Sequence, residues 1–231
     1  MKIQSSIDIN TILNDIQKTE GPGRGRIGPS MMGHPCDRLL WLLNKGKDVK
    51  VISGRTNRIF RHGHIIEDLV VNDLRLAGLD IVDDKEKLKI AINYKGHRMI
   101  GELDGVIKSG VPGAPRKKHV LEVKSSNDKA FKDLIKNGVQ KSKPQHYIQM
   151  QLYMYATGQY GKIIDRAFYV VVNKNDDSYY TERVEFDKII AEYQLDRWVH
   201  IIESKEMPMR ISQDPSWYQC KFCDMYGYCF K

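Results

Sequence analysis

The period with which apolar residues recur along the chain predicts which segments form helices and which form strands. Between residues 54 and 77 apolar side chains return every three or four positions, which is typical of a helix with one buried face, and Gly78 ends the run. The same spacing predicts helices over 6–19, from Cys36 onward, and over 127–137, 145–157 and 187–205, with a Gly- and Pro-rich loop over 20–35. Alternation and β-branched residues predict strands near 79–83, 87–94, 97–108, 118–125, 165–173 and 179–186.

The order of these elements predicts an α/β fold in which helices flank a mixed central sheet. With 231 residues, of which 41% are hydrophobic, the chain can bury the core of a single domain. Residues 111–115 break the chain between the strands 97–108 and 118–125, so these two strands should form a hairpin. No targeting segment or membrane-length apolar run is visible, and we therefore expect a cytoplasmic protein without a membrane partner.

Charged residues in this hairpin are the most informative feature of the sequence. Glu122 and Lys124 alternate with Leu121 and Val123, so the two charges share one face of a strand while the apolar pair points into the core. A carboxylate and an ammonium group in an apolar strand are costly to bury unless they bind something. Asp104 on the neighbouring arm adds a second acidic donor for a hard divalent cation. The alternative is a salt bridge between two strands at the surface.

Two further motifs flank the hairpin. Gly63 is followed four positions later by Glu67 on the long predicted helix, and Gln151 is followed four positions later by Tyr155 on a later one. The ordered set G-x-x-x-(H/E), G-x-x-D, E-x-K and Q-x-x-x-Y resembles the RecB-like branch of the PD-(D/E)xK nuclease superfamily.

The resemblance implies a restriction-endonuclease-like core and hydrolysis of DNA phosphodiesters by water that Mg²⁺ or Mn²⁺ activates. By their place in the motifs, the metal ligands would be Glu67, Asp104, Glu122 and the carbonyl group of Val123. Lys124 would orient the attacking water or steady the phosphate. Gln151 and Tyr155 would lie near the DNA strand.

Two of these assignments have competitors in the sequence. Gln149 and Tyr153 form an overlapping Q-x-x-x-Y match, and we prefer the later match because Gln-Leu-x-x-Tyr is the commoner form in the family. His64 lies beside Gly63 and is an alternative ligand, but Glu67 occupies the motif position itself.

Four cysteines carry a second signal. Cys220, Cys223 and Cys229 form a C-x2-C-x5-C tail, and Cys36 precedes the other motifs. Disulfides are rare in cytosolic proteins, so the four thiols indicate metal or cluster ligands. One cysteine before the nuclease motifs and three after them resembles the iron–sulfur nucleases of the Cas4 and AddB type, as does the segment from Cys36 to Trp41. The resemblance implies a [4Fe–4S] cluster, and structural Zn²⁺ is the alternative.

The cluster would join the two ends of the chain over the core. The expected organisation is one nuclease domain, 1–231, made of an N-terminal helical segment with the first cysteine (1–53), a nuclease core (54–205) and a C-terminal cluster segment (206–231).

A formal charge of +8 suits a polyanionic partner, although charge alone is also compatible with a merely basic soluble protein. The candidate DNA-binding residues are Arg24, Arg26, Arg38, Lys141 and Lys143.

With the resemblance, the sequence predicts a metal-dependent deoxyribonuclease, an exonuclease that acts on DNA ends or single strands. Its setting would be recombination, repair or phage replication in a bacterial or phage-infected cell. The sequence contains no helicase motif, so unwinding would come from a helicase, recombinase or other replication partner. The alternative is a catalytically silent or zinc-stapled nucleic-acid-binding module.

Overall fold

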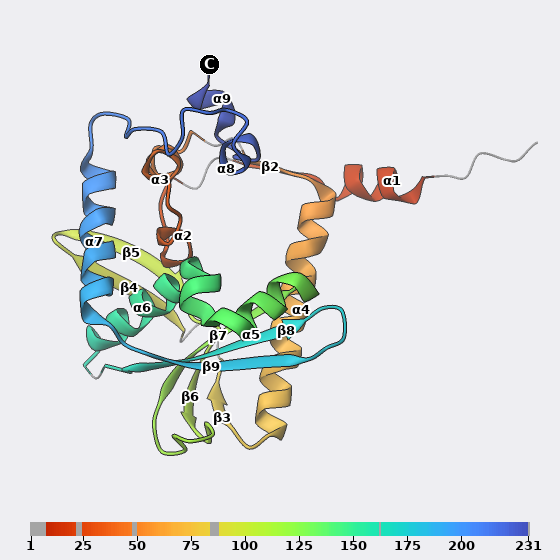
Figure 1. Cartoon of the computed structure of the whole chain (residues 1–231), viewed down its shortest axis with the longest axis vertical. Coiled ribbons are helices and arrows are strands. Elements are labelled where there is room, and N and C mark those ends of the chain that lie inside the picture. Colours follow the sequence, from red (N-terminus) through yellow and green to blue (C-terminus); the bar gives the residue numbers. More distant parts are fainter. Residues whose placement is uncertain (1–7, 22–24, 48–49, 84–87, 162, 231) are drawn as a thin grey trace, which may run out of the picture.

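A five-stranded mixed sheet forms the centre of the computed structural model, which describes residues 8–21, 25–47, 50–83, 88–161 and 163–230 (Figure 1). The strand order is β3 (Asp80–Val82), β6 (Gly105–Ser109), β7 (His119–Ser126), β8 (Arg166–Asn173) and β9 (Tyr179–Glu185). β7 and β8 are parallel and every other neighbouring pair is antiparallel. The expected α/β fold with a mixed sheet flanked by helices is confirmed.

Helices connect the parallel strands and cover both faces of the sheet. Parallel neighbours need a crossover, and α5 (Asp128–Ser142) and α6 (Pro144–Gly158) provide it. With α7 (Lys188–Glu203) they cover the face that carries Val120 and Tyr169. On the other face α4 (Gly54–Leu76) packs against Leu121 and Val123. The alternation along β7 therefore separates two hydrophobic cores, and Leu121 and Val123 lie in the core as expected.

The expected strand over 97–108 is wrong in one respect, because it divides into two strands of different sheets. β5 (His97–Glu102) pairs with β4 (Lys89–Tyr94) in a two-stranded sheet, while β6 pairs with β7. The break falls at Leu103 and Asp104, where the amide of Leu103 donates to the carbonyl of Leu88. Asp104 consequently precedes the β6–β7 hairpin instead of lying within its first arm.

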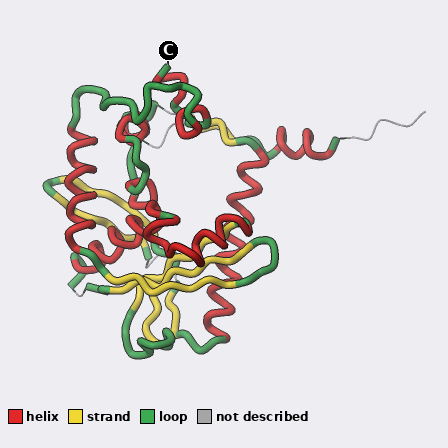
Figure 2. The backbone as a smooth tube through the Cα atoms, in the orientation of Figure 1, coloured by secondary structure: helices red, strands yellow, loops and turns green. Residues whose placement is uncertain are grey.

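A part of the N-terminal segment lies beside the C-terminal segment at the top of the molecule, whereas the first helix projects outwards (Figure 2). The N-terminal part contains α1 (Ile9–Ile16), α2 (Pro29–Met32) and α3 (Asp37–Asn44), with β1 (Thr19–Gly21) and β2 (Lys50–Ile52) paired between them; α2 forms in the segment expected as a loop. The C-terminal part contains α8 (Tyr218–Lys221) and α9 (Tyr226–Cys229). Trp41 Nε1 donates to the Ser204 carbonyl (2.9 Å) and Arg38 Nε donates to the Pro208 carbonyl (2.6 Å), which ties α3 to the segment after α7.

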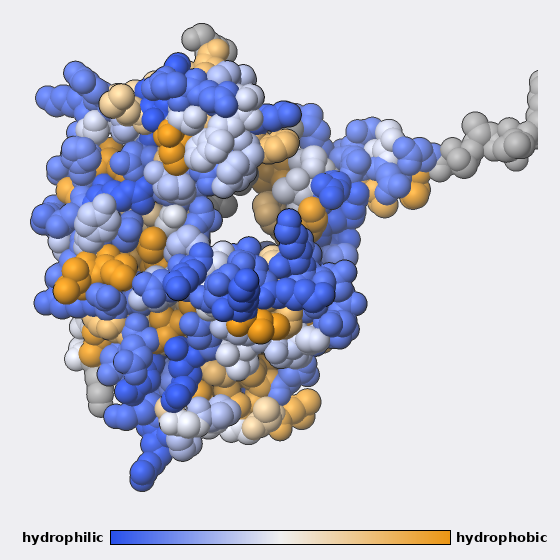
Figure 3. Space-filling model, viewed as in Figure 1, coloured by the Kyte–Doolittle hydropathy of each residue, from blue (hydrophilic) through white to orange (hydrophobic). Residues whose placement is uncertain are grey.

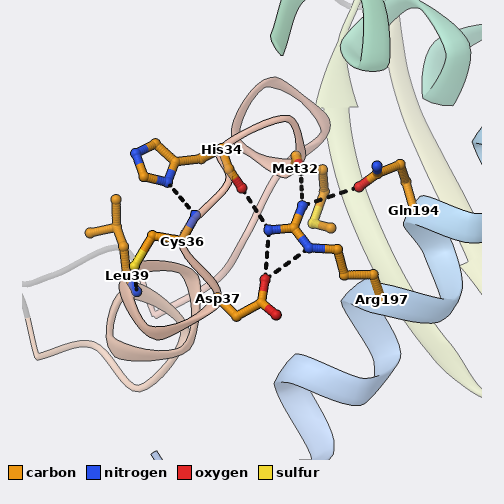
Figure 4. Close-up of polar contacts among 7 residues, drawn as sticks. All are labelled: Met32, His34, Cys36, Asp37, Leu39, Gln194 and Arg197. Carbon is orange, nitrogen blue, oxygen red and sulfur yellow. Dashed lines mark hydrogen bonds and ion pairs between the residues drawn. The ribbon is translucent and has the colours of Figure 1, made fainter. Parts of the chain in front are cut away.

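Arg197 of α7 anchors the segment that leads into α3 (Figure 4). Its guanidinium group donates to Asp37 Oδ1 (2.6 and 2.8 Å), to the carbonyls of Met32 (2.7 Å) and His34 (2.6 Å), and to Gln194 Oε1 (3.2 Å). The side chain is only 15% exposed, so these contacts are shielded from water. One residue of α7 therefore sets the position of the loop before α3.

Replacing Arg197 with methionine should destabilise the protein by about 3 kcal/mol, because two backbone carbonyls and a carboxylate lose a charged donor. For a chain of this length the melting temperature should fall by roughly 6–12 °C. Thermal unfolding followed by circular dichroism measures the effect, with Arg116→Met at an exposed loop position as the control. Equal melting temperatures for the two variants would show that Arg197 does not anchor the loop.

Across the described residues, no helix combines the length and the apolar character needed to cross a membrane.

Candidate active site and cysteine cavity

Glu122 is the charged residue around which the candidate active site is built. Its side chain is fully buried on β7 and contacts the ammonium group of Lys124, whose side chain is 29% exposed. Apart from this ion pair, neither carboxylate oxygen of Glu122 accepts a hydrogen bond from the described residues. Burial raises the pKa of Glu122 to about 8, against the opposing pull of Lys124. A buried carboxylate with so few partners is costly, and a cation bound to it would remove the cost.

Two other carboxylates act on the same group. Asp104 Oδ2 accepts a hydrogen bond from the Val123 amide (2.7 Å), which ties the loop before β6 to the strand that carries Glu122. The negative charges of Asp104 and Glu67 both raise the pKa of Glu122 further, so all three carboxylates lie within electrostatic reach of one another. The structure thus brings Glu67, Asp104 and Glu122 together from α4, a loop and β7.

Lys124 is held in its charged form by this acidic surrounding. Burial alone would lower the pKa of its ammonium group, but the charges of Glu122, Asp104 and Glu67 outweigh burial and raise it. Glu122 meets Lys124 inside the fold, so the alternative of a salt bridge at the surface is wrong for Glu122.

The donor set suits a hard divalent cation, because carboxylate oxygens are the ligands that Mg²⁺ and Mn²⁺ prefer. Among the described residues, no three Cys, His, Asp or Glu side chains converge as a ready-made metal site. In this structure the Lys124 ammonium group contacts the Glu122 carboxylate. Apart from this contact, neither oxygen of Glu122 has a hydrogen-bond donor among the described residues, and the three carboxylates repel one another electrostatically. A divalent cation bound between them would relieve both costs.

The four cysteines line one cavity between the start of α3 and the C-terminal segment. Cys36 and Cys220 are buried, and Cys223 and Cys229 are partly buried. Leu39, Ile211 and Phe230 are among the apolar side chains around them.

Backbone amides point at two of the sulfur atoms. The amide of Leu39 donates to Cys36 Sγ and that of Met225 donates to Cys223 Sγ, both at 3.4 Å. Burial raises the pKa of the Cys220 and Cys223 thiols, and the neighbouring cysteines raise it further. In the described part of the chain these thiols do not form a ready-made ligand group. Four soft donors around one apolar cavity, with amide donors to sulfur, nevertheless fit a cluster or a zinc ion.

A sequence profile of the YqaJ-like viral recombinase domain matches residues 34–160, more than half of the chain. The chain belongs to this family. The match places the chain in the PD-(D/E)xK nuclease superfamily, and that part of the resemblance is confirmed. The matched region contains Cys36 and every carboxylate of the candidate site, while the cysteine tail lies beyond it.

Solved structures support the family fold. An alkaline exonuclease (LHK-Exo) from Laribacter hongkongensis aligns with a TM-score of 0.54 at 16% identity, over 83% of this chain and 90% of that one. Its complex with dAMP aligns with a TM-score of 0.54 at 17% identity, over 77% and 86%. The structure of SSO0001 aligns with a TM-score of 0.51 at 14% identity, over 96% and 93%. At such low identities, the structural alignments establish a shared fold and no more. No curated protein matches the sequence.

The two overlapping Q-x-x-x-Y matches lie on different sides of α6. Gln151 is fully buried, donates to the Glu185 carbonyl (3.0 Å) and accepts from the Asp187 amide (2.7 Å), so it joins α6 to the end of β9. Tyr155 packs edge-on against Tyr94, with ring centroids 6.2 Å apart. The preferred match therefore faces away from the carboxylates.

Gln149 and Tyr153 lie on the side of α6 that faces Glu122 and Asp104. Gln149 Nε2 donates to the Tyr153 hydroxyl (3.3 Å). Burial raises the pKa of that hydroxyl, and the charges of Glu122 and Asp104 raise it further. Gly101 makes room for the ring, because a Cβ atom there would lie 2.7 Å from Tyr153 Cε1. The contacts therefore favour Gln149 and Tyr153, instead of Gln151 and Tyr155, as the pair beside the carboxylates.

The candidate DNA-binding residues differ in their exposure and contacts. Arg24 lies outside the described residues, whereas Arg26 and Lys141 are exposed. Arg38 binds the Pro208 carbonyl, so at least one of its donors holds the fold together instead of facing DNA. Lys143 lines a cavity together with Lys124.

Two histidines clarify the assignments at the motif positions. His64, the alternative ligand, is exposed, while Glu67 is the residue of that helix whose charge reaches Glu122. His146 is not part of any of the motifs. Its Nδ1 atom lies 2.6 Å from the hydroxyl oxygen of Tyr169. Burial first, and then the charges of Lys124 and Lys143, lower the pKa of His146 to about 3, so it remains neutral beside the site.

Proposed function

We propose that this chain is a metal-dependent DNA nuclease, and specifically an exonuclease that serves recombination. The observation that carries the proposal is that Glu67, Asp104 and Lys124 all lie within electrostatic reach of the buried carboxylate of Glu122. Membership of the YqaJ-like viral recombinase family supports the same conclusion. The name of LHK-Exo, an alkaline exonuclease with a similar fold, supports the choice of an exonuclease.

In this proposal Glu67, Asp104, Glu122 and the Val123 carbonyl would hold Mg²⁺ or Mn²⁺. The ion would make a bound water more acidic and neutralise charge at the phosphate. The Val123 amide keeps Asp104 oriented towards that position. Lys124 presents a point charge to the attacking water or to a non-bridging phosphate oxygen, a task that suits a compact ammonium group. Gln149 and Tyr153 support the carboxylates from α6.

The substrate is DNA presented as an end or as a single strand. A net charge of +8 favours a polyanion. Figure 3 shows the molecule hollowed through its middle, beside α4, which carries Glu67. A single strand that enters there would pass close to the carboxylates, and a helicase or recombinase partner would supply it.

We further propose that Cys36, Cys220, Cys223 and Cys229 ligate a [4Fe–4S] cluster, as in nucleases of the Cas4 and AddB type. The shared apolar cavity and the amide donors to Cys36 and Cys223 support this ligand set. Structural Zn²⁺ is the alternative occupant. In either case the cysteines staple α3 to the C-terminal segment.

A time course on end-labelled single- and double-stranded DNA tests the nuclease. We expect degradation with Mg²⁺ or Mn²⁺ and none in EDTA. Lys124→Ala should lower the rate by about 10²–10⁴-fold while DNA binding persists, because the ammonium group acts on the reacting groups. Lys108→Ala, at an exposed position of β6, is the matched control. Undiminished cleavage in EDTA, or wild-type rates for Lys124→Ala, would refute the mechanism.

A further inference from the structure

Lys124 also lines a second cavity. Its volume is about 350 Å³, which lies within the range of small-molecule sites. It is bounded by the end of β7, the first turns of α5, the junction of α5 and α6, and the end of β8. Lys124 thus contacts the Glu122 carboxylate and also lines this cavity.

The lining combines cationic and apolar side chains. Lys124, Lys143 and Lys174 contribute three ammonium groups, and none of the described residues that line the cavity is acidic. Leu134 and Val171 contribute apolar surface. A ligand that matches this lining carries a negative charge and a hydrophobic ring or sugar face.

Ser126 supplies an unused polar group at the same place. Its hydroxyl oxygen is buried and has no hydrogen-bond partner among the described residues. The backbone amide of Lys174 donates to the Ser126 carbonyl (2.9 Å), which fixes Lys174 beside it. A buried hydroxyl without a partner is unusual, and a ligand oxygen in the cavity would complete its hydrogen bonding.

We propose that this cavity is the subsite for the nucleotide next to the phosphodiester that is cut, and that it takes one deoxynucleoside phosphate unit of a single DNA strand. The proposal rests on the nuclease function proposed above. Lys174, Lys143 and Ser126 bind the phosphate group, while the apolar wall packs against the sugar and base. Lys124 joins the two sites, so a strand held in the cavity presents its next phosphate to the carboxylates.

Binding of thymidine 5′-monophosphate to the full chain in EDTA tests the subsite without cleavage. The monophosphate should compete with a fluorescent single-stranded oligothymidylate at least tenfold better than inorganic phosphate or thymidine. Ser126→Ala should weaken its binding about tenfold, because a hydrogen bond to a charged group is lost. Lys174→Ala should weaken it similarly and reduce the salt slope of oligonucleotide binding by about 0.7. Lys136→Ala, at an exposed position of α5, is the charge-matched control and should bind as wild type.

Wild-type binding of the monophosphate by both Ser126→Ala and Lys174→Ala would overturn the subsite. Equal competition by inorganic phosphate would also overturn it, because the cavity would then be a simple anion site. Failure of the nuclease proposal has a different signature. In that case the wild type binds the monophosphate but cleaves no DNA with any metal.

Discussion

Glu122→Gln should lower the rate of DNA cleavage by about 10³-fold or more. The substitution should also change how the stability of the metal-free protein depends on pH. The loss of cleavage follows from removing a charged oxygen donor at the proposed metal position. The amide has the same shape as the carboxylate, so the variant should fold. DNA binding measured in EDTA should persist.

The stability effect follows from the pKa of Glu122, which burial raises to about 8 in the folded protein. Between the unfolded value near 4.5 and about 8, the folded chain binds more protons than the unfolded chain, so stability falls as the pH rises. The loss is on the order of a few kcal/mol above pH 8. Because Glu122→Gln carries no such group, its melting temperature should rise relative to wild type from pH 5 to pH 9.

Added Mg²⁺ or Mn²⁺ should raise the melting temperature of the wild type and should leave that of Glu122→Gln unchanged. Binding to the folded state raises its stability, and the ion needs the ionised carboxylate that Glu122→Gln lacks. Glu102→Gln, at an exposed position of β5, is the control and should follow wild type throughout. Parallel pH–melting curves for wild type and Glu122→Gln, with equal metal stabilisation, would contradict the assignment of Glu122.

Local patterns predicted most of the elements because each pattern reflects packing against one neighbour. The apolar stripe over 54–77 became α4, and the alternation along β7 separated the charged face from Leu121 and Val123. The division of the expected strand 97–108 could not be predicted, because the residues on both sides of Asp104 have strand character. What divides them is the pairing of β5 with β4, a contact between segments that the pattern does not connect.

The candidate site shows the same limit. Spacing along the chain indicated Glu67, Asp104, Glu122 and Lys124, because each lies at a fixed place in a motif. The choice between Gln151 and Gln149 depends on which face of α6 points at β7, and α6 is buried on most sides, at Gln149 and Gln151 alike. Side-chain periodicity is uninformative on such a helix. The contact of Arg38 with the Pro208 carbonyl could not be predicted for a related reason, since the two residues are 170 positions apart.

Cys36→Ser should remove bound iron and sulfide and lower the melting temperature by roughly 10 °C or more, because the free energy of ligation is partly free energy of folding. Cleavage should fall indirectly, since the carboxylates and Lys124 are untouched. This substitution isolates the ligand role. Cys36 is the N-cap of α3, where its sulfur accepts a hydrogen bond from the Leu39 amide. Serine is a preferred N-cap residue and keeps that hydrogen bond.

Loss of stability in Cys36→Ser therefore reports a missing ligand and not a missing helix cap. Iron and acid-labile sulfide analysis after anaerobic purification identifies what the four thiols hold. About four irons and four sulfides per chain in the wild type, and none in Cys36→Ser, are expected for a [4Fe–4S] cluster. One zinc per chain without sulfide would show that the cysteines bind structural Zn²⁺ instead of a cluster. The nuclease proposal would be unaffected. An unchanged melting temperature and metal content in Cys36→Ser would remove Cys36 from the ligand set, because its hydrogen bond to the helix would then be its only role.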